Sequence, residues 1–532
     1  MIRLALRITA LLIAYLCSAV TVGADDDANP AIAAPHKLND RATLQAIDCW
    51  SGVKAASAQN VECYYFYVPM DWENSNSPLI GFPVLVKRST SPSSDSPVLH
   101  LGAGGPGSGM GIDNPEAVDF FLQQYAHFST ELGRDLIVID PRGSGLATPR
   151  LTCQRYVDNE EPRWSQDLSL QEWAEQTRVD YAHCIEASIK QGIDFSGFNS
   201  LNVARDAEAL RKSLDIKQWV VVGVSHAAIY AQMLIDLAPA TVEALVLDSP
   251  AFTRLRFHDN FVRQSKYGLE LMARYCEINP ECREPIPDVE TRIWRLVDKF
   301  NDNPLELTLP HPYEERNMNV VVNGTRFLDT LHASLYFSVL FEELPGLIQQ
   351  MENDNPSVFA FFLHYYIGFL LDGLYADLSS ISHHCREEAL VSDPVLLAQQ
   401  VAALPDRYRK AAALAWNWQP YCEQMGIAVN MPQSAHSVTQ PTLIFQGRWD
   451  AITPLHDTLS QLPYFPDHRM LVFPTTHSLI DTEDCMAAIV AQFIADQDST
   501  EDALRSYSRH CNGPISSQVL ERTDSNADTA AQ

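Results

Sequence analysis

Short, uninterrupted runs of apolar and β-branched residues recur along the chain. Such runs are typical of strands buried on both faces, so each one predicts a strand inside a covered sheet. Helical patterns lie between several of the runs, as where Val203, Ala207, Leu210 and Leu214 follow one another at intervals of three or four residues. Strands that alternate with helices predict an α/β fold with a mostly parallel sheet and helices on both faces. The predicted strands are residues 98–101, 136–139, 219–223, 244–247, 442–445 and 470–473.

This alternation stops after Pro250 and resumes near Pro441. The interval carries helical patterns rich in Leu, Phe and Tyr, which predict a helical cap inserted between two strands. Its most apolar run, residues 358–371, is too short to span a bilayer and is either a core helix of the cap or a hydrophobic wall over a substrate pocket. The predicted division is residues 25–250 and 440–516 for the core, 251–439 for the cap and 517–532 for a disordered tail.

The amino-terminal residues have the pattern of an export signal. Arg3 and Arg7 precede an apolar run that closes on small residues at 22–24, and an acidic stretch follows. Residues 1–24 are therefore predicted to be a cleaved signal peptide, with a signal anchor as the alternative. Cleavage predicts a secreted or periplasmic protein without a membrane attachment.

Composition narrows the range of partners. The 532-residue chain is 46% hydrophobic with a net charge of −29, and no Lys/Arg-rich cluster stands out. Nucleic acid and anionic membranes are therefore poor partners, whereas the oligomeric state stays open. Asn323-Gly-Thr spells a glycosylation sequon, a match that is common by chance.

Cysteine usage agrees with export. Of eleven cysteines, Cys17 falls in the signal, and the even number that remains favours disulfides. Metal binding is the rival interpretation, but the chain has no CxxC pair and its histidines do not cluster at ligand spacing. Neighbours in the sequence suggest five local pairs: Cys49 with Cys63, Cys153 with Cys184, Cys276 with Cys282, Cys385 with Cys422, and Cys485 with Cys511.

Three residues that could perform acyl transfer stand at the ends of predicted strands. Ser225 follows one strand and precedes a helix in a GxSxA frame, Asp450 follows the next-to-last strand and His477 the last. A serine hydroxyl needs a histidine to take its proton and a carboxylate to orient that histidine. A serine at a helix start, an aspartate in a turn and a lone histidine are each common without function. Their order and their strand-end positions together favour a Ser-His-Asp triad.

The oxyanion of an acyl-transfer reaction needs backbone N–H donors. One is expected to be the amide of His226, and the other that of Gly105 or Gly104 in the glycine-rich segment 101–109. Glycine-rich loops also bind phosphates, but this one lacks the Lys-Ser/Thr ending of a nucleotide loop. A plain flexible turn is the remaining alternative.

These residues resemble the secreted serine aminopeptidases of the tripeptidyl aminopeptidase and proline iminopeptidase group, which are α/β hydrolases. The resemblance covers nearly the whole mature chain and is most specific in GGPGSG at 104–109 and DPRGSG at 140–145. It implies an α/β-hydrolase fold, a peptide substrate with a free N-terminus, a cap that measures the substrate, and no metal or cofactor. The buried substrate amine would need a carboxylate, for which Glu387 and Glu388 are the first candidates and Glu342 and Glu343 the second.

The chain departs from this group beside the predicted nucleophile and base. His226-Ala227 stands where the group usually has Tyr-Gly, and Thr and Ser flank His477 in place of two glycines. A carboxylesterase or lipase on the same scaffold is the alternative function, because fold and triad do not fix the leaving group. A catalytically inactive binding protein is a third possibility that the intact triad disfavours.

Overall fold

The structure is a computed structural model that describes residues 41–506, apart from 51–52, 54–59, 113, 256, 390–393, 404–417, 428–436 and 478–483. The predicted signal, the tail and the side chains of Cys485 and Cys511 therefore lie outside the described residues. A nine-stranded sheet forms the centre of the molecule, in the order β1-β2-β3-β5-β4-β6-β7-β10-β11. No helix among the described residues is both long and apolar enough to cross a membrane.

All six predicted strands belong to this sheet. They pair in parallel with one another, as the uninterrupted apolar runs indicated. Their bounds are β4 Val98–His100, β5 Leu136–Ile139, β6 Trp219–Val224, β7 Val242–Asp248, β10 Thr442–Gly447 and β11 His468–Phe473.

Both faces of the parallel strands are covered by helices. Along β6, Val221 packs into the cluster that contains α7 (Ser200–Ser213) and α8 (Ala227–Leu237), whereas Val220 packs into the cluster on the other face. The helices of that second face are α3 (Pro115–Gln124), α4 (Ala126–Thr130), α20 (Asp484–Ala495) and α21 (Glu501–Ser506). The alternate direction of successive side chains explains why these strands are apolar throughout.

Three antiparallel strands extend one edge of the sheet and were not predicted. They are β1 Thr43–Ile47, β2 Val61–Pro69 and β3 Leu79–Lys87. Strand β2 carries tyrosines at half-buried positions, so it lacks the continuous apolar run that marked the parallel strands. Antiparallel edges can leave one face in water.

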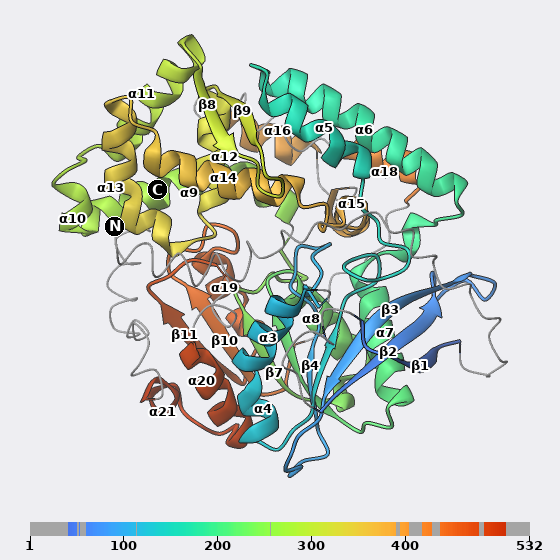
Figure 1. Ribbon diagram of the computed structural model, residues 1–532. Coiled ribbons are helices and arrows are strands. Elements are labelled where there is room, and N and C mark those ends of the chain that lie inside the picture. Colours follow the sequence, from blue (N-terminus) through green and yellow to red (C-terminus); the bar gives the residue numbers. More distant parts are fainter. Residues whose placement is uncertain are drawn as a thin grey trace.

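The described elements between β7 and β10, called the cap below, lie above the sheet in the view of Figure 1. They include a hairpin of β8 (Leu305–Pro310) with β9 (Asn317–Val322), which the expectation of helices alone did not include. The helices are α9 Phe257–Ile278, α10 Pro280–Arg283, α11 Val289–Asp302, α12 Gly324–Ser334, α13 Ser338–Glu352, α14 Ser357–Leu371, α15 Asp377–His384, α16 Pro394–Ala403 and α18 Gln419–Met425. Helix α14 buries Phe359, Phe362 and Leu363 in a core shared with α9 to α13 and the hairpin, whereas α15 and α18 pack into the cluster that contains α7 and α8. The domain division itself stays a prediction.

Four of the five suggested cysteine pairs are disulfides in the structure. The bonds join Cys49 to Cys63, Cys153 to Cys184, Cys276 to Cys282 and Cys385 to Cys422. Asn323, by contrast, does not present its sequon to solvent. Its side chain is buried and donates hydrogen bonds to Asp167 and to the carbonyl of Leu168, so its amide nitrogen is occupied in the folded chain.

Candidate active site

Ser225 occupies the tight turn between β6 and α8. Its φ is 54°, in the left-handed region that residues other than glycine rarely adopt. Backbone hydrogen bonds hold it there: Ser225 N–H donates to the carbonyl of Asp248 over 2.9 Å, and the carbonyl of Ser225 accepts from the amides of Ala251 over 3.0 Å and Ala228 over 3.2 Å. A methyl group added at Gly223 would lie 2.9 Å from the carbonyl oxygen of Ala227, so the turn needs a glycine at that position. This is the strained strand-turn-helix geometry that exposes a nucleophile.

The structure brings Asp450 and His477 together. They follow the neighbouring strands β10 and β11, and Oδ2 of Asp450 lies 2.9 Å from Nδ1 of His477. The other oxygen of Asp450 accepts hydrogen bonds from the amides of Ile452 and Thr453, and the hydroxyl of Thr453 donates to Oδ2. Because Asp450 is fully buried and accepts all of these bonds, its carboxylate is fixed against the imidazole.

Electrostatics at His477 favour a basic imidazole. Burial acts to lower its pKa, but the charge of Asp450, the hydrogen bond to it and the charge of Asp248 together raise the pKa above its usual value. Within the described part of the chain, Nε2 of His477 is buried and makes no hydrogen bond, so the Ser225–His477 bond is not formed in this structure. Such bonds are often long before substrate binds.

The glycine-rich loop lies directly against the serine turn. A methyl group added at Gly104 would lie 2.9 Å from Cβ of Ser225 and 3.2 Å from the amide nitrogen of His226. Gly104 and Gly105 both have φ near 100°, a conformation suited to glycine. His226 is the N-cap of α8, where an amide has no acceptor within the helix. The backbone of Gly104 therefore lies close to both Ser225 and the amide of His226.

Asp140 connects this loop to the DPRGSG segment. Its carboxylate accepts hydrogen bonds from the amides of Met110 and Leu146, over 2.6 and 2.8 Å, and Gly109 packs against Gly145. The two glycine motifs therefore form one folded unit beside Ser225. Sequence reasoning noted the motifs but missed the role of Asp140, which follows a strand just as Asp450 does.

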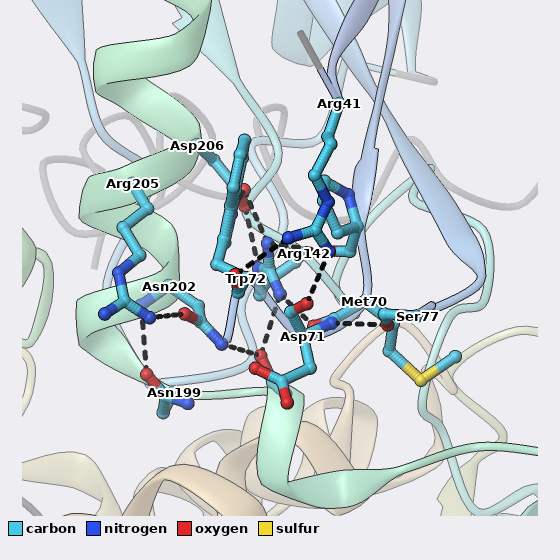
Figure 2. A network of polar contacts seen from close by, with 12 residues as sticks. Arg41, Met70, Asp71, Trp72, Ser77, Arg142, Asn199, Asn202, Arg205 and Asp206 are labelled. Atoms are coloured by element: carbon cyan, nitrogen blue, oxygen red, sulfur yellow. Dashed lines mark hydrogen bonds and ion pairs between the residues drawn. The ribbon is translucent and has the colours of Figure 1, made fainter. Parts of the chain in front are cut away.

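Arg142 anchors the same unit to the core. The guanidinium is fully buried and forms a bidentate ion pair with Asp206 of α7, as Figure 2 shows. It also donates to the carbonyls of Met70 and Gly197, and Trp72 donates to Asp206. A buried charge is stable only when paired and hydrogen-bonded in this way.

The side chain of His226 lies within a buried polar cluster rather than in solvent. Its Nε2 lies 3.3 Å from the hydroxyl of Ser200 and 3.9 Å from Oε2 of Glu387. Its ring also contacts those of His383 and His384. Burial and these two histidines lower the pKa of His226 well below its usual range, so the imidazole is neutral.

Both predicted amine-binding glutamates belong to a π-helical turn, Cys385–Ala389, that the disulfide to Cys422 ties down. Glu387 reaches the start of α7, where it accepts hydrogen bonds from the amide and the hydroxyl of Ser200. Burial raises the pKa of Glu387 to about 7, against the effect of these bonds. Glu388 lies 3.5 Å from Nδ1 of His384. Glu387 is thus the glutamate that reaches the residue after Ser225.

The cap contacts the glycine-rich loop directly. The hydroxyl of Tyr375 donates to the carbonyl of Pro106, and the amide of Ala376 donates to the carbonyl of Gly107. A methyl group at Gly107 would lie 2.7 Å from the carbonyl oxygen of Ala376. The segment that precedes the two glutamates therefore also covers the loop beside Ser225.

The sheet, the serine turn and the acid–histidine pair at neighbouring strand ends have the arrangement of the α/β-hydrolase fold. Residues 101–283 match the family described as the alpha/beta hydrolase fold. The chain therefore has the α/β-hydrolase fold.

Known proteins that resemble the chain include serine proteases. Proteins named Serine protease Hip1, from Mycobacterium bovis and Mycobacterium tuberculosis, are 25% identical over 315 residues. The match covers 56% of this chain and 57% of those relatives, so the chain spans little more than half of their length. Similar solved structures include a proline iminopeptidase from Mycobacterium smegmatis, 15% identical with a TM-score of 0.34, covering 79% of this chain and 96% of that one. A serine hydrolase from Cycloclasticus zankles is 10% identical with a TM-score of 0.35, covering 86% of this chain and 99% of that one.

Proposed function

We propose that the chain is an exported serine aminopeptidase that acts through an acyl-enzyme on Ser225. The observation that carries the proposal is the buried Asp450–His477 pair at the end of two strands, in a sheet whose strand β6 ends at a serine held in a left-handed turn against Gly104. Similarity to serine proteases supports peptide substrates. Disulfides support export, since they persist in oxidising compartments.

In this mechanism His477 Nε2 takes the hydroxyl proton as Oγ of Ser225 attacks the scissile carbonyl carbon. The amides of His226 and of Gly104 or Gly105 stabilise the oxyanion. His477 then gives the proton to the leaving amine as the C–N bond breaks, which leaves an ester on Ser225. Water attacks this ester with His477 again as base, and release of the acid restores the serine. Asp450 orients His477 and stabilises the imidazolium.

Glu387 supports the aminopeptidase assignment. The side chain of Glu387 is buried, and it lies 3.9 Å from the imidazole of His226, the residue after Ser225. Because this imidazole is neutral, it would not repel a substrate ammonium. A carboxylate whose pKa burial has raised to about 7 gains from a positive partner. A substrate ammonium bound to Glu387 would place the free N-terminus close to Ser225.

A panel of chromogenic substrates tests the proposal. We expect cleavage of mono-, di- or tripeptidyl p-nitroanilides with free N-termini, no cleavage of their N-acetylated forms, and loss of both hydrolysis and fluorophosphonate labelling in Ser225→Ala. Equal cleavage of free and acetylated substrates, or a preference for simple p-nitrophenyl esters, would favour the carboxylesterase alternative. Hydrolysis that survives in Ser225→Ala would contradict the mechanism itself.

A further inference from the structure

An exposed aromatic side chain of the cap lies against the candidate general base. Tyr336 is 45% exposed, although the His477 beside it is only 7% exposed. The two rings meet edge to face with centroids 5.3 Å apart. An aromatic side chain that remains open to solvent next to a buried catalytic ring has a free face available to a ligand.

Tyr336 is held in this place by its backbone and its neighbours. It lies between α12 (Gly324–Ser334) and α13 (Ser338–Glu352), and its carbonyl accepts a hydrogen bond from the hydroxyl of Thr476 over 2.9 Å. The next residue, Phe337, packs edge to face on Tyr365 of α14 with centroids 4.6 Å apart. These contacts fix the backbone while the ring stays exposed, which is the arrangement of a preformed binding wall rather than of a mobile loop.

The chemistry of acyl transfer decides which part of the substrate meets this wall. His477 must deliver its proton to the leaving nitrogen, so the leaving group has to lie beside the imidazole. Whatever borders that ring borders the leaving group. We propose that Tyr336 is a specificity-determining residue that selects leaving groups with an aromatic or flat apolar side chain at the residue after the scissile bond. The inference rests on the proposed serine mechanism.

Trapping of the acyl-enzyme isolates this step, because an added amine occupies the leaving-group position in reverse. The acyl-enzyme is formed from a p-nitrophenyl ester or a p-nitroanilide. Phenylalanine amide or glycine amide is present as the acceptor, and the products of acyl transfer to each amine are separated and quantified. We expect the wild type to favour phenylalanine amide. Tyr336→Ala should lower the phenylalanine-to-glycine ratio roughly threefold to tenfold, the range expected for one aromatic contact.

Two variants serve as controls. Tyr336→Phe keeps the ring and should keep the ratio. Phe369→Ala removes a cap aromatic of similar exposure, 43%, whose ring lies against Tyr375 instead, and should also keep it. Because the Tyr336 side chain is exposed, its truncation is not expected to unfold the chain, and equal thermal melting of all variants checks this.

The possible outcomes separate the inference from the function on which it rests. An unchanged ratio in Tyr336→Ala, or an equal loss of transfer to both amides and to water, would overturn the role in leaving-group selection. A selective loss with phenylalanine amide, restored in Tyr336→Phe, would establish it. Failure of the wild type to form any acyl-enzyme on Ser225 would overturn the proposed function, and this inference with it.

Discussion

Replacement of Asp450 by asparagine is expected to invert the hydrogen bonding of His477. In the structure Oδ1 accepts two backbone N–H bonds, from Ile452 over 2.8 Å and Thr453 over 2.9 Å, while Oδ2 faces Nδ1 of His477. The asparagine oxygen will keep the two backbone donors, so its NH2 group takes the position of Oδ2. An NH2 group donates to Nδ1, which forces the imidazole proton onto Nε2. In that tautomer Nε2 cannot accept the proton of Ser225.

The expected loss is large because both the geometry and the charge change. A wrong histidine tautomer lowers kcat by about 10⁴-fold in serine hydrolases, which corresponds to about 5.5 kcal/mol of transition-state stabilisation. Burial alone would lower the pKa of His477, and in the wild type Asp450 contributes most of the opposing effect that raises it. Without the charge of Asp450, the pKa of His477 should fall. The acidic limb of kcat/KM should therefore move to lower pH in the variant.

The same substitution changes how stability depends on pH. A histidine whose pKa is raised on folding stabilises the fold fully below its unfolded pKa of about 6.5, and this contribution is lost as pH rises through the folded pKa. The difference in Tm between wild type and Asp450→Asn should therefore shrink as the pH rises above about 6.5.

Steady-state rates, active-site titration and melting curves measure these effects. Asp467→Asn serves as the control. Asp467 directly precedes β11 and is ion-paired with Arg469, and its replacement should keep full activity. A loss of less than a hundredfold in Asp450→Asn, or an acidic limb that does not move, would refute the assignment of Asp450 as the orienting acid.

Other substitutions test the rest of the site. Glu387→Gln should raise KM about tenfold for free N-termini, through loss of a charged hydrogen bond, and leave KM for simple esters unchanged; since burial raises the pKa of Glu387 to about 7, the wild-type KM should likewise rise as pH falls through 7. Gly104→Ala places a methyl group 2.9 Å from Cβ of the serine and should lower kcat about 10²-fold, whereas Gly346→Ala, with its nearest atom 3.9 Å away, should not. Joint replacement of Cys385 and Cys422 by serine removes the disulfide between two positions 37 residues apart in the sequence. Loss of this cross-link should lower the free energy of unfolding by about 4 kcal/mol, as measured by denaturant titration.

Sequence patterns predicted the parallel strands and the residues at their ends for one physical reason. A strand buried on both faces must be apolar throughout, so 219–223 and 442–445 were visible as runs, and the first polar residues beyond such runs stand at a shared edge of the sheet. Asp450 and His477 were named on that basis, and the structure places their side chains in contact. The catalytic roles stay predictions that the variants above test.

Other features depend on contacts that no local pattern encodes. Glu387 and Ser200 are 187 residues apart in the chain, and their hydrogen bonds exist only because the cap folds back onto the start of α7. Arg142 and Asp206 pair over 64 residues, and neither lies in an apolar run that would show burial. Strand β2 gave a weak signal because its half-buried positions carry tyrosines, so apolar and polar residues do not alternate along it. In each case tertiary packing, not local preference, decides the structure.

The glycine-rich loop is held in place from two sides, by the core and by the cap. The cap is therefore in contact with the segment proposed to bind the oxyanion. From the core, the carboxylate of Asp140 accepts a hydrogen bond from the amide of Met110, just after the loop. From the cap, the amide of Ala376 donates a hydrogen bond to the carbonyl of Gly107, and the hydroxyl of Tyr375 donates one to the carbonyl of Pro106. Donors for an oxyanion are effective only when they are fixed before the reaction. The cap therefore helps to fix the glycine-rich loop, and a variant that weakens these cap contacts should lower kcat even for substrates too small to touch the cap.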